Sequence, residues 1–91
     1  MSDLEAHFKT ASEESVKLSK APDTSTKLKL YALFKQGSEG DVQGARPGFT
    51  DLMGRTKYDA WAELKGTSKE AAMQQYIDLV ERLKQELGYA G

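Results

Sequence analysis

The sequence predicts an all-α protein, a four-helix bundle in up-down-down-up order. Four segments carry apolar residues at helical spacing, and no run alternates apolar and polar residues strongly enough to indicate a strand. A long, glycine-containing stretch separates the second segment from the third, whereas a very short connection joins the third to the fourth. In a bundle, a long crossover lets two successive helices run in the same direction, which a tight turn cannot do.

The first helix is expected over residues 3–20, and Pro22 ends it. Ser2 and Glu5 have the S-x-x-E spacing of a capping box. One apolar face holds residues at helical spacing: Leu4, Phe8, Ala11 and Leu18. We expect this face to pack on the core.

The second helix is expected to begin near Thr24 or Ser25 and to end at Gly37, which suits a left-handed cap. Its core face is expected to hold Leu30, Leu33 and Phe34. A second stripe, rotated away from that face, holds Leu28, Tyr31 and Lys35. A stripe that changes from aliphatic to aromatic to cationic indicates a surface for an amphiphilic partner.

The third helix is expected from Asp51 or Leu52 to Lys65, with Lys57 beside its apolar face. That face holds Tyr58, Trp61 and Leu64, and we expect Trp61 in the core.

The fourth helix is expected to begin at a capping box of Thr67 and Glu70 and to end at Gly88 after a long apolar stripe. Because the connection before it is short, the third and fourth helices are expected to pack as near-antiparallel neighbours.

The composition disfavours several classes of protein. Ninety-one residues suit one small domain spanning 1–91. A net charge of −1 disfavours nucleic-acid binding, which needs a clear positive excess. The longest apolar run, LYALF, is far shorter than the roughly 20 residues that span a bilayer. The start lacks the basic and apolar regions of a signal peptide. We therefore expect a soluble cytoplasmic protein without stable membrane insertion, and take a monomer as the default state.

Catalytic and metal-binding patterns are scarce. The chain has no cysteine, and its one histidine, His7, lies among charged residues without a visible partner for general-base work. It contains no Walker phosphate loop, and GSEGDVQG neither matches the dinucleotide fingerprint nor follows a strand. We expect no enzyme, no metal site and no cofactor.

A binding site is easier to assemble. Tyr31 offers a ring face for stacking, and Lys35, one turn on, offers an ammonium for a phosphate. Lys57 and Tyr76 lie on the other two helices, at positions that could face the same groove. Taken singly, such a tyrosine is usually a boundary residue and such a lysine is usually solvated. Together they indicate a groove for an amphiphilic anion.

Several linked motifs resemble the acyl-CoA-binding protein family. They lie in the segments LYALFKQGSEGDV and RPGFTDLMGRTKYDAWAELKGTSKEAAMQQYIDLVERL. The likeness covers essentially the whole chain and is strongest over residues 30–83. It implies a four-helix up-down-down-up bundle that binds medium- to long-chain fatty acyl-CoA thioesters one to one. It also implies a carrier and buffer without catalysis. Whether acyl-CoA-using enzymes contact this carrier transiently is left open by the sequence.

The resemblance implies roles for individual residues. Tyr31 would stack on the adenine ring, while Lys35 and Lys57 would hold the ribose 3′-phosphate region. Tyr76 would contact the CoA head group, and Leu28 would border the acyl chain.

The chain also departs from the family's usual pattern. Phe34, expected in the same site, stands where tyrosine is common. Val16 stands where the first helix often carries a ligand-contacting lysine, and Lys27 occupies a position that is often apolar near the acyl chain. Whether Lys17 or Lys20 compensates is left open by the sequence.

Two other functions are weighed against the carrier. A helical adaptor would take an amphipathic peptide in its groove and would not depend on phosphate or on the charge of Lys35. A thioesterase or isomerase acting on a CoA substrate would need a nucleophile or base near the thioester, and the sequence offers no candidate for either.

Overall fold

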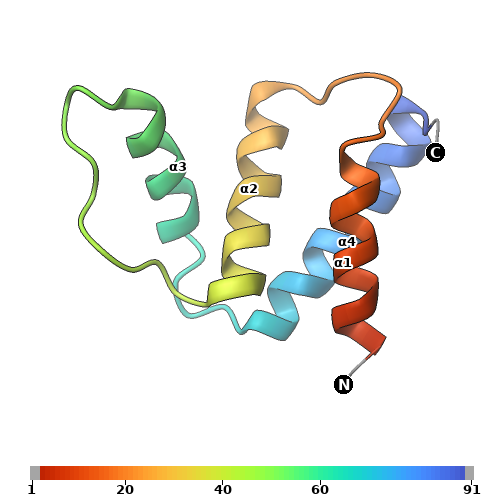
Figure 1. Cartoon of the computed structure of the whole chain (residues 1–91), viewed down its shortest axis with the longest axis horizontal. Helices are drawn as coiled ribbons and strands as arrows, with labels where there is room; N and C mark the ends of the chain where they lie inside the picture. Colours follow the sequence, from red (N-terminus) through yellow and green to blue (C-terminus); the bar gives the residue numbers. More distant parts are fainter. Residues whose placement is uncertain (1–2, 90–91) are drawn as a thin grey trace.

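The computed structural model describes residues 3–89 and contains four α-helices (Figure 1). They are α1 (Asp3–Ser15), α2 (Thr24–Glu39), α3 (Leu52–Ala62) and α4 (Lys69–Leu87). In Figure 1, α1 and α4 run in one direction and α2 and α3 in the other, so the predicted up-down-down-up bundle is confirmed. Residues 40–51 form the crossover between α2 and α3.

The core lies between α1, α2 and α4. Its buried members are Phe8, Ala11, Leu33, Ala72, Tyr76, Leu79, Val80 and Leu83. The extensive helix interfaces among the described residues are α2–α4, α1–α4 and α2–α3. The expectation that α3 and α4 pack as antiparallel neighbours was therefore wrong. The short turn between them leads the chain past the end of α2, so that α2 lies between α3 and the α1–α4 pair (Figure 1).

The first helix is shorter than predicted. It ends at Ser15, not at residue 20, and the chain then turns toward the end of α4. There Leu18 forms an isolated antiparallel bridge with Tyr89, and the amide of Ser19 donates to the carbonyl of Gly88 at 3.0 Å. This bridge and its hydrogen bond to a distant segment take the place of the last helical turn that the sequence predicted. The capping box expected at Ser2 lies outside the described residues.

Gly37 does not end α2. It is buried inside the helix, which continues to Glu39 and ends at Gly40 with a positive φ of 83°. A Cβ at position 37 would lie 3.0 Å from Cζ of Phe8 and 3.2 Å from Cγ of Met73. Glycine is therefore required there by the close approach of α1 and α4, not by the backbone conformation.

The ends that flank the turn between α3 and α4 also differ from the prediction. The α-helix of α3 stops at Ala62 instead of Lys65, and residues 63–66 form a turn. Ser68, not Thr67, caps α4, because its side chain accepts a hydrogen bond from the amide of Ala71 at 3.0 Å. The carbonyl of Thr67 instead accepts from Nε2 of Gln36, a fully buried side chain, at 2.7 Å. Capping by Ser68 leaves that carbonyl free to anchor the turn on α2.

Asp41 joins the start of the crossover to this turn. Its Oδ1 accepts hydrogen bonds from the amide of Gly66 and from Nε2 of Gln36, both at 2.9 Å. The Gly66 amide, followed by Gln36, lowers the pKa of Asp41 below 3.8. Asp41 therefore stabilises the fold above its unfolded pKa, and this contribution is lost as the pH falls through the folded pKa.

Asp41→Asn is expected to make the free energy of unfolding depend less steeply on pH under acidic conditions. The unfolding free energy of the wild type, measured by urea denaturation, should fall more steeply than that of the variant as the pH drops below 3.8. The slope should not vanish, because Asp23 and Asp59 also have lowered pKa values. If the unfolding free energies of the two proteins depend on pH in the same way below 3.8, the Asp41 contacts do not contribute to the pH dependence of stability.

Candidate functional site

Two lysines and two aromatic rings form the centre of the candidate site, between α2 and α3. Nζ of Lys57, on α3, lies 5.4 Å from the ring centroid of Tyr31 on α2. Nζ of Lys35, on α2, lies 5.0 Å from the ring centroid of Trp61 on α3. Both distances suit cation–π contacts. The structure therefore brings together three of the residues singled out in the sequence, Tyr31, Lys35 and Lys57.

Lys35 has an acidic partner on its own helix. Its ammonium donates to the carboxylate of Glu39, one turn further along α2, and this hydrogen bond raises the pKa of Lys35. The lysine side chain is 26% exposed and that of Glu39 is 50% exposed. An anionic ligand that binds Lys35 must therefore compete with Glu39. Sequence reasoning missed this pair, although the i, i+4 spacing of Lys and Glu could have indicated it.

Phe34 and Tyr76 lie side by side with different exposure. Phe34 is 39% exposed, so the expectation that it lies wholly on the core face was wrong, and its ring stacks on Phe8 at a centroid distance of 5.5 Å. Tyr76 is 4% exposed, and its hydroxyl donates to Oγ of Ser15 at 3.2 Å. Burial raises the pKa of Tyr76. Phe34 thus presents part of its ring to solvent. The buried ring of Tyr76 packs against it, with the two ring centroids 5.9 Å apart.

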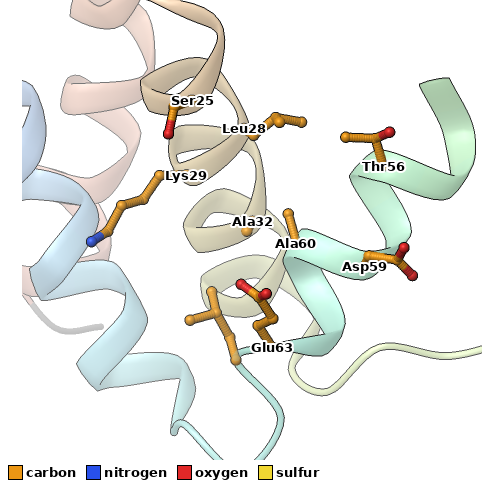
Figure 2. Close-up of a pocket in the computed structure, with 9 residues that line it drawn as sticks. Ser25, Leu28, Lys29, Ala32, Thr56, Asp59, Ala60 and Glu63 are labelled. Atoms are coloured by element: carbon orange, nitrogen blue, oxygen red, sulfur yellow. The ribbon is translucent and has the colours of Figure 1, made fainter.

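Leu28, also singled out in the sequence, lines a cavity of about 510 Å³ (Figure 2). The cavity lies between α2 and α3, and the apolar part of its lining includes Ala32 and Ala60. It does not include Tyr31, Lys35 or Lys57, and it carries the carboxylates of Asp59 and Glu63. The lining also includes Lys29, and Asp59 is paired with Arg46, so the cavity wall carries charges of both signs. The cavity and the cluster of Tyr31, Lys35 and Lys57 have no residue in common.

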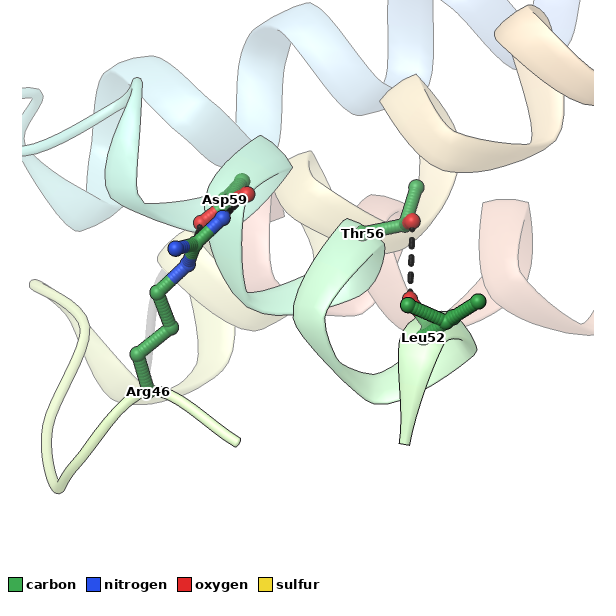
Figure 3. A network of polar contacts seen from close by, with 4 residues as sticks. All are labelled: Arg46, Leu52, Thr56 and Asp59. Carbon is green, nitrogen blue, oxygen red and sulfur yellow. Dashed lines mark hydrogen bonds and ion pairs between the residues drawn. The ribbon is translucent and has the colours of Figure 1, made fainter. Parts of the chain in front are cut away.

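Hydrogen bonds and one ion pair join the crossover to α3. These contacts hold α3 beside α2. Nε1 of Trp61 donates to the carbonyl of Gly40 at 2.9 Å, and the Tyr58 hydroxyl donates to the carbonyl of Gly44 at 3.0 Å. Arg46 forms a bidentate pair with Asp59 at 2.9 and 2.7 Å, which lowers the pKa of Asp59 (Figure 3). Trp61 is buried, as predicted, yet its contacts with Gly40 and Lys35 were not foreseen.

Neither a metal centre nor a transmembrane helix is found in residues 3–89. No three His, Cys, Asp or Glu residues in that range gather so that they could hold a metal ion. None of the helices described there is both long and apolar enough to cross a bilayer.

Comparison with known proteins places this geometry in a family. The model of the family described as Acyl CoA binding protein matches residues 5–80. The chain belongs to the acyl-CoA-binding protein family. An acyl-CoA-binding protein homologue from Drosophila melanogaster is 50% identical over 76 residues, which cover 84% of this chain and 88% of that protein.

Solved structures of acyl-CoA-binding proteins have the same fold. Acyl-CoA-binding protein 2 of Oryza sativa is 39% identical and superposes with a TM-score of 0.88, covering 92% of this chain and 91% of the other. The homologue from Moniliophthora perniciosa is 37% identical and has a TM-score of 0.85, covering 96% and 84%.

A further relative, human enoyl-CoA delta isomerase 2, is similar to this chain in only one part of its length. It is 49% identical over 70 residues, which cover 77% of this chain and 18% of that protein. The similarity is therefore confined to a small part of a much longer enzyme.

Proposed function

We propose that the chain is a non-catalytic carrier and buffer that binds fatty acyl-CoA thioesters one to one, within one domain spanning residues 1–91. The observation that carries the proposal is the cluster of Tyr31, Lys35 and Lys57 between α2 and α3, in a member of the acyl-CoA-binding protein family. The relatives named as acyl-CoA-binding proteins support the choice of ligand.

The lysine cluster would bind the nucleotide end of CoA. Tyr31 offers its ring to the adenine, and the ammonium groups of Lys35 and Lys57 would hold the ribose 3′-phosphate. A charge-assisted hydrogen bond contributes about 1.5–3 kcal/mol, so two lysines on one phosphate would orient the head group firmly. Phe34, with its partly exposed ring, would line the same groove. Tyr76, which the resemblance implies to contact the head group, is buried against Phe34 and donates its hydroxyl to Ser15, so it would reach the ligand only at the edge of the Phe34 ring.

The acyl chain would extend past Leu28 into the cleft between α2 and α3. The methyl groups of Ala32 and Ala60 line that cleft and would replace water around the tail. Each buried CH₂ contributes roughly 0.8 kcal/mol. The ligand class that follows is medium- to long-chain acyl-CoA, with no further cofactor.

A series of acyl-CoA thioesters tests this assignment. Calorimetric titration should show affinity rising roughly tenfold for each two added carbons until the cleft is full. Tyr31→Ala should lower all affinities and leave the increment per carbon unchanged, because the ring and the tail contact different parts of the ligand. Affinity that does not change with chain length would mean that the tail stays in water.

The carrier role requires no nucleophile, which sets it apart from a thioesterase or isomerase. Release of free CoA during incubation with palmitoyl-CoA would contradict it. The cytoplasm as compartment, a monomeric state and transient contact with acyl-CoA-using enzymes belong to the same proposal.

A further inference from the structure

The cavity between α2 and α3 has a mixed lining. Four of the residues that line it are apolar, and five carry a hydroxyl group or a charge. The apolar four are Leu28, Ala32, Ala60 and Leu64, and the polar five are Ser25, Lys29, Thr56, Asp59 and Glu63. An unsubstituted hydrocarbon chain matches only the first group, because it offers no atom that can form a hydrogen bond with the second.

Two of the polar five are already engaged within the fold. The Thr56 hydroxyl donates to the carbonyl of Leu52 at 2.9 Å (Figure 3). The carboxylate of Asp59 accepts both hydrogen bonds of the Arg46 guanidinium. These two side chains therefore have partners before any ligand enters the cavity.

Lys29 and Glu63 have no such partners. Within residues 3–89, neither the ammonium of Lys29 nor the carboxylate of Glu63 forms a hydrogen bond or an ion pair, with each other or with a third group. Lys29 reaches the cavity from α2, and Glu63 reaches it from the residue that follows α3. The wall of the cavity thus carries a free cationic donor and a free anionic acceptor.

These two groups lie beyond the apolar part of the cleft. Figure 2 shows Ala32 and Ala60 between Leu28 and Glu63. An acyl chain that enters past Leu28 and crosses the two alanines would therefore approach Glu63 with its far end. The Lys29 side chain extends from α2 toward α4 in the same view.

The far end of the cleft opens toward polar side chains. Lys29 also lines a second cavity, of about 220 Å³, between α2 and α4. The lining of that cavity includes Gln75, Asp78 and Arg82. The cleft is therefore apolar in its middle and polar where the tip of a ligand would lie.

We propose that this polar end binds a hydroxyl group at the tip of the acyl chain, so that the protein binds ω-hydroxyacyl-CoA thioesters as well as unsubstituted ones. A hydroxyl group donates to the carboxylate of Glu63 and accepts from the ammonium of Lys29, so it satisfies both. A terminal carboxylate would attract Lys29 and be repelled by Glu63, and a methyl group would bond to neither. The proposal rests on the carrier function, because the CoA end of the same ligand occupies the lysine cluster.

Calorimetric titration of matched thioesters tests the proposal. Palmitoyl-CoA is compared with ω-hydroxypalmitoyl-CoA, and lauroyl-CoA with ω-hydroxylauroyl-CoA, so that the hydroxyl is placed at two depths. In a wholly apolar cleft, the hydroxyl would weaken binding roughly 5- to 150-fold, because it would lose its water without gaining a partner. We expect instead that, for at least one of the two lengths, the ω-hydroxy thioester binds as tightly as its parent or more tightly.

One double variant assigns the effect to the two side chains. Lys29→Met combined with Glu63→Met should lower the affinity ratio of ω-hydroxy thioester to parent by about fivefold or more. Both side chains belong to exposed residues, so the fold should persist. Lys65→Met combined with Glu13→Met makes the same replacements at exposed positions outside the cleft and should leave the ratio unchanged.

The position of the hydroxyl provides a second control. β-Hydroxypalmitoyl-CoA carries its hydroxyl beside the thioester, far from Lys29, so its affinity relative to palmitoyl-CoA should be the same in the wild type and in the Lys29/Glu63 variant. A change as large as that of the ω-hydroxy thioester would contradict the proposed location.

The results separate this proposal from the carrier function. Tight binding of both parent thioesters, with both ω-hydroxy forms weakened at least about fivefold, would overturn the hydroxyl site and leave the carrier standing. A ratio that the Lys29/Glu63 variant does not change would also overturn the site. Absence of binding by every thioester would overturn the carrier function and the hydroxyl site together.

Discussion

Replacement of Lys35 by alanine is expected to weaken palmitoyl-CoA binding roughly 10- to 150-fold, because the phosphate loses a charge-assisted contact of about 1.5–3 kcal/mol. The fold should persist, because the Lys35 side chain lies at the surface of α2 and is partly exposed. Isothermal titration with palmitoyl-CoA measures the loss. The urea midpoint should stay close to that of the wild type.

Glu39→Gln provides the matched control, because it breaks the same ion pair from the other side. The variant frees Lys35 and removes a negative charge near the expected phosphate. It should bind palmitoyl-CoA more tightly by a factor of about 1.4 to 5, in line with the roughly 0.2–1 kcal/mol of an exposed pair. If the two variants lose affinity equally, the ion pair itself, and not the lysine, supports binding.

Truncation of Leu33 to alanine is expected to have the largest effect on stability. Leu33 is 1% exposed and belongs to the buried core where α2 meets α4. Its loss should lower the unfolding free energy by about 2–5 kcal/mol, since the removed methyl groups leave a cavity that the core fills only in part. Urea denaturation measures this change.

Leu52→Ala is the matched control for that truncation. It removes the same atoms from a side chain that is 69% exposed, and the unfolding free energy should change by no more than about 0.5 kcal/mol. A loss below about 1 kcal/mol for Leu33→Ala would show that the core relaxes around the missing side chain or that Leu33 is not its centre.

Helix identity and direction could be predicted from the sequence because they follow from local periodicity and from connection length. The starts of α2 and α3 and the end of α4 at Gly88 were also predicted correctly. The ends of α1 and α2 were not, because contacts between distant residues decide them. The end of α1 depends on a bridge between Leu18 and Tyr89, and the path of α2 through Gly37 depends on the close approach of Phe8 and Met73. No pattern within either helix contains that information.

In the candidate site, too, some residues could be predicted from the sequence and some contacts could not. The stripe of Leu28, Tyr31 and Lys35 was visible on one helix, and Lys57 could be placed on the third helix at a position that could face the same groove. The partners of Lys35 were harder to foresee, because Trp61 comes from α3 and its position depends on the crossover carbonyl of Gly40.

The carrier assignment is tested most directly by calorimetric titration of the wild-type chain with palmitoyl-CoA, free CoA and palmitate. The account predicts tight one-to-one binding of the thioester and far weaker binding of both fragments, because head group and tail are held by separate parts of one groove. The absence of palmitoyl-CoA binding to folded protein, confirmed by a second binding method, would contradict it. The peptide-binding groove would then become the leading explanation of the cluster between α2 and α3.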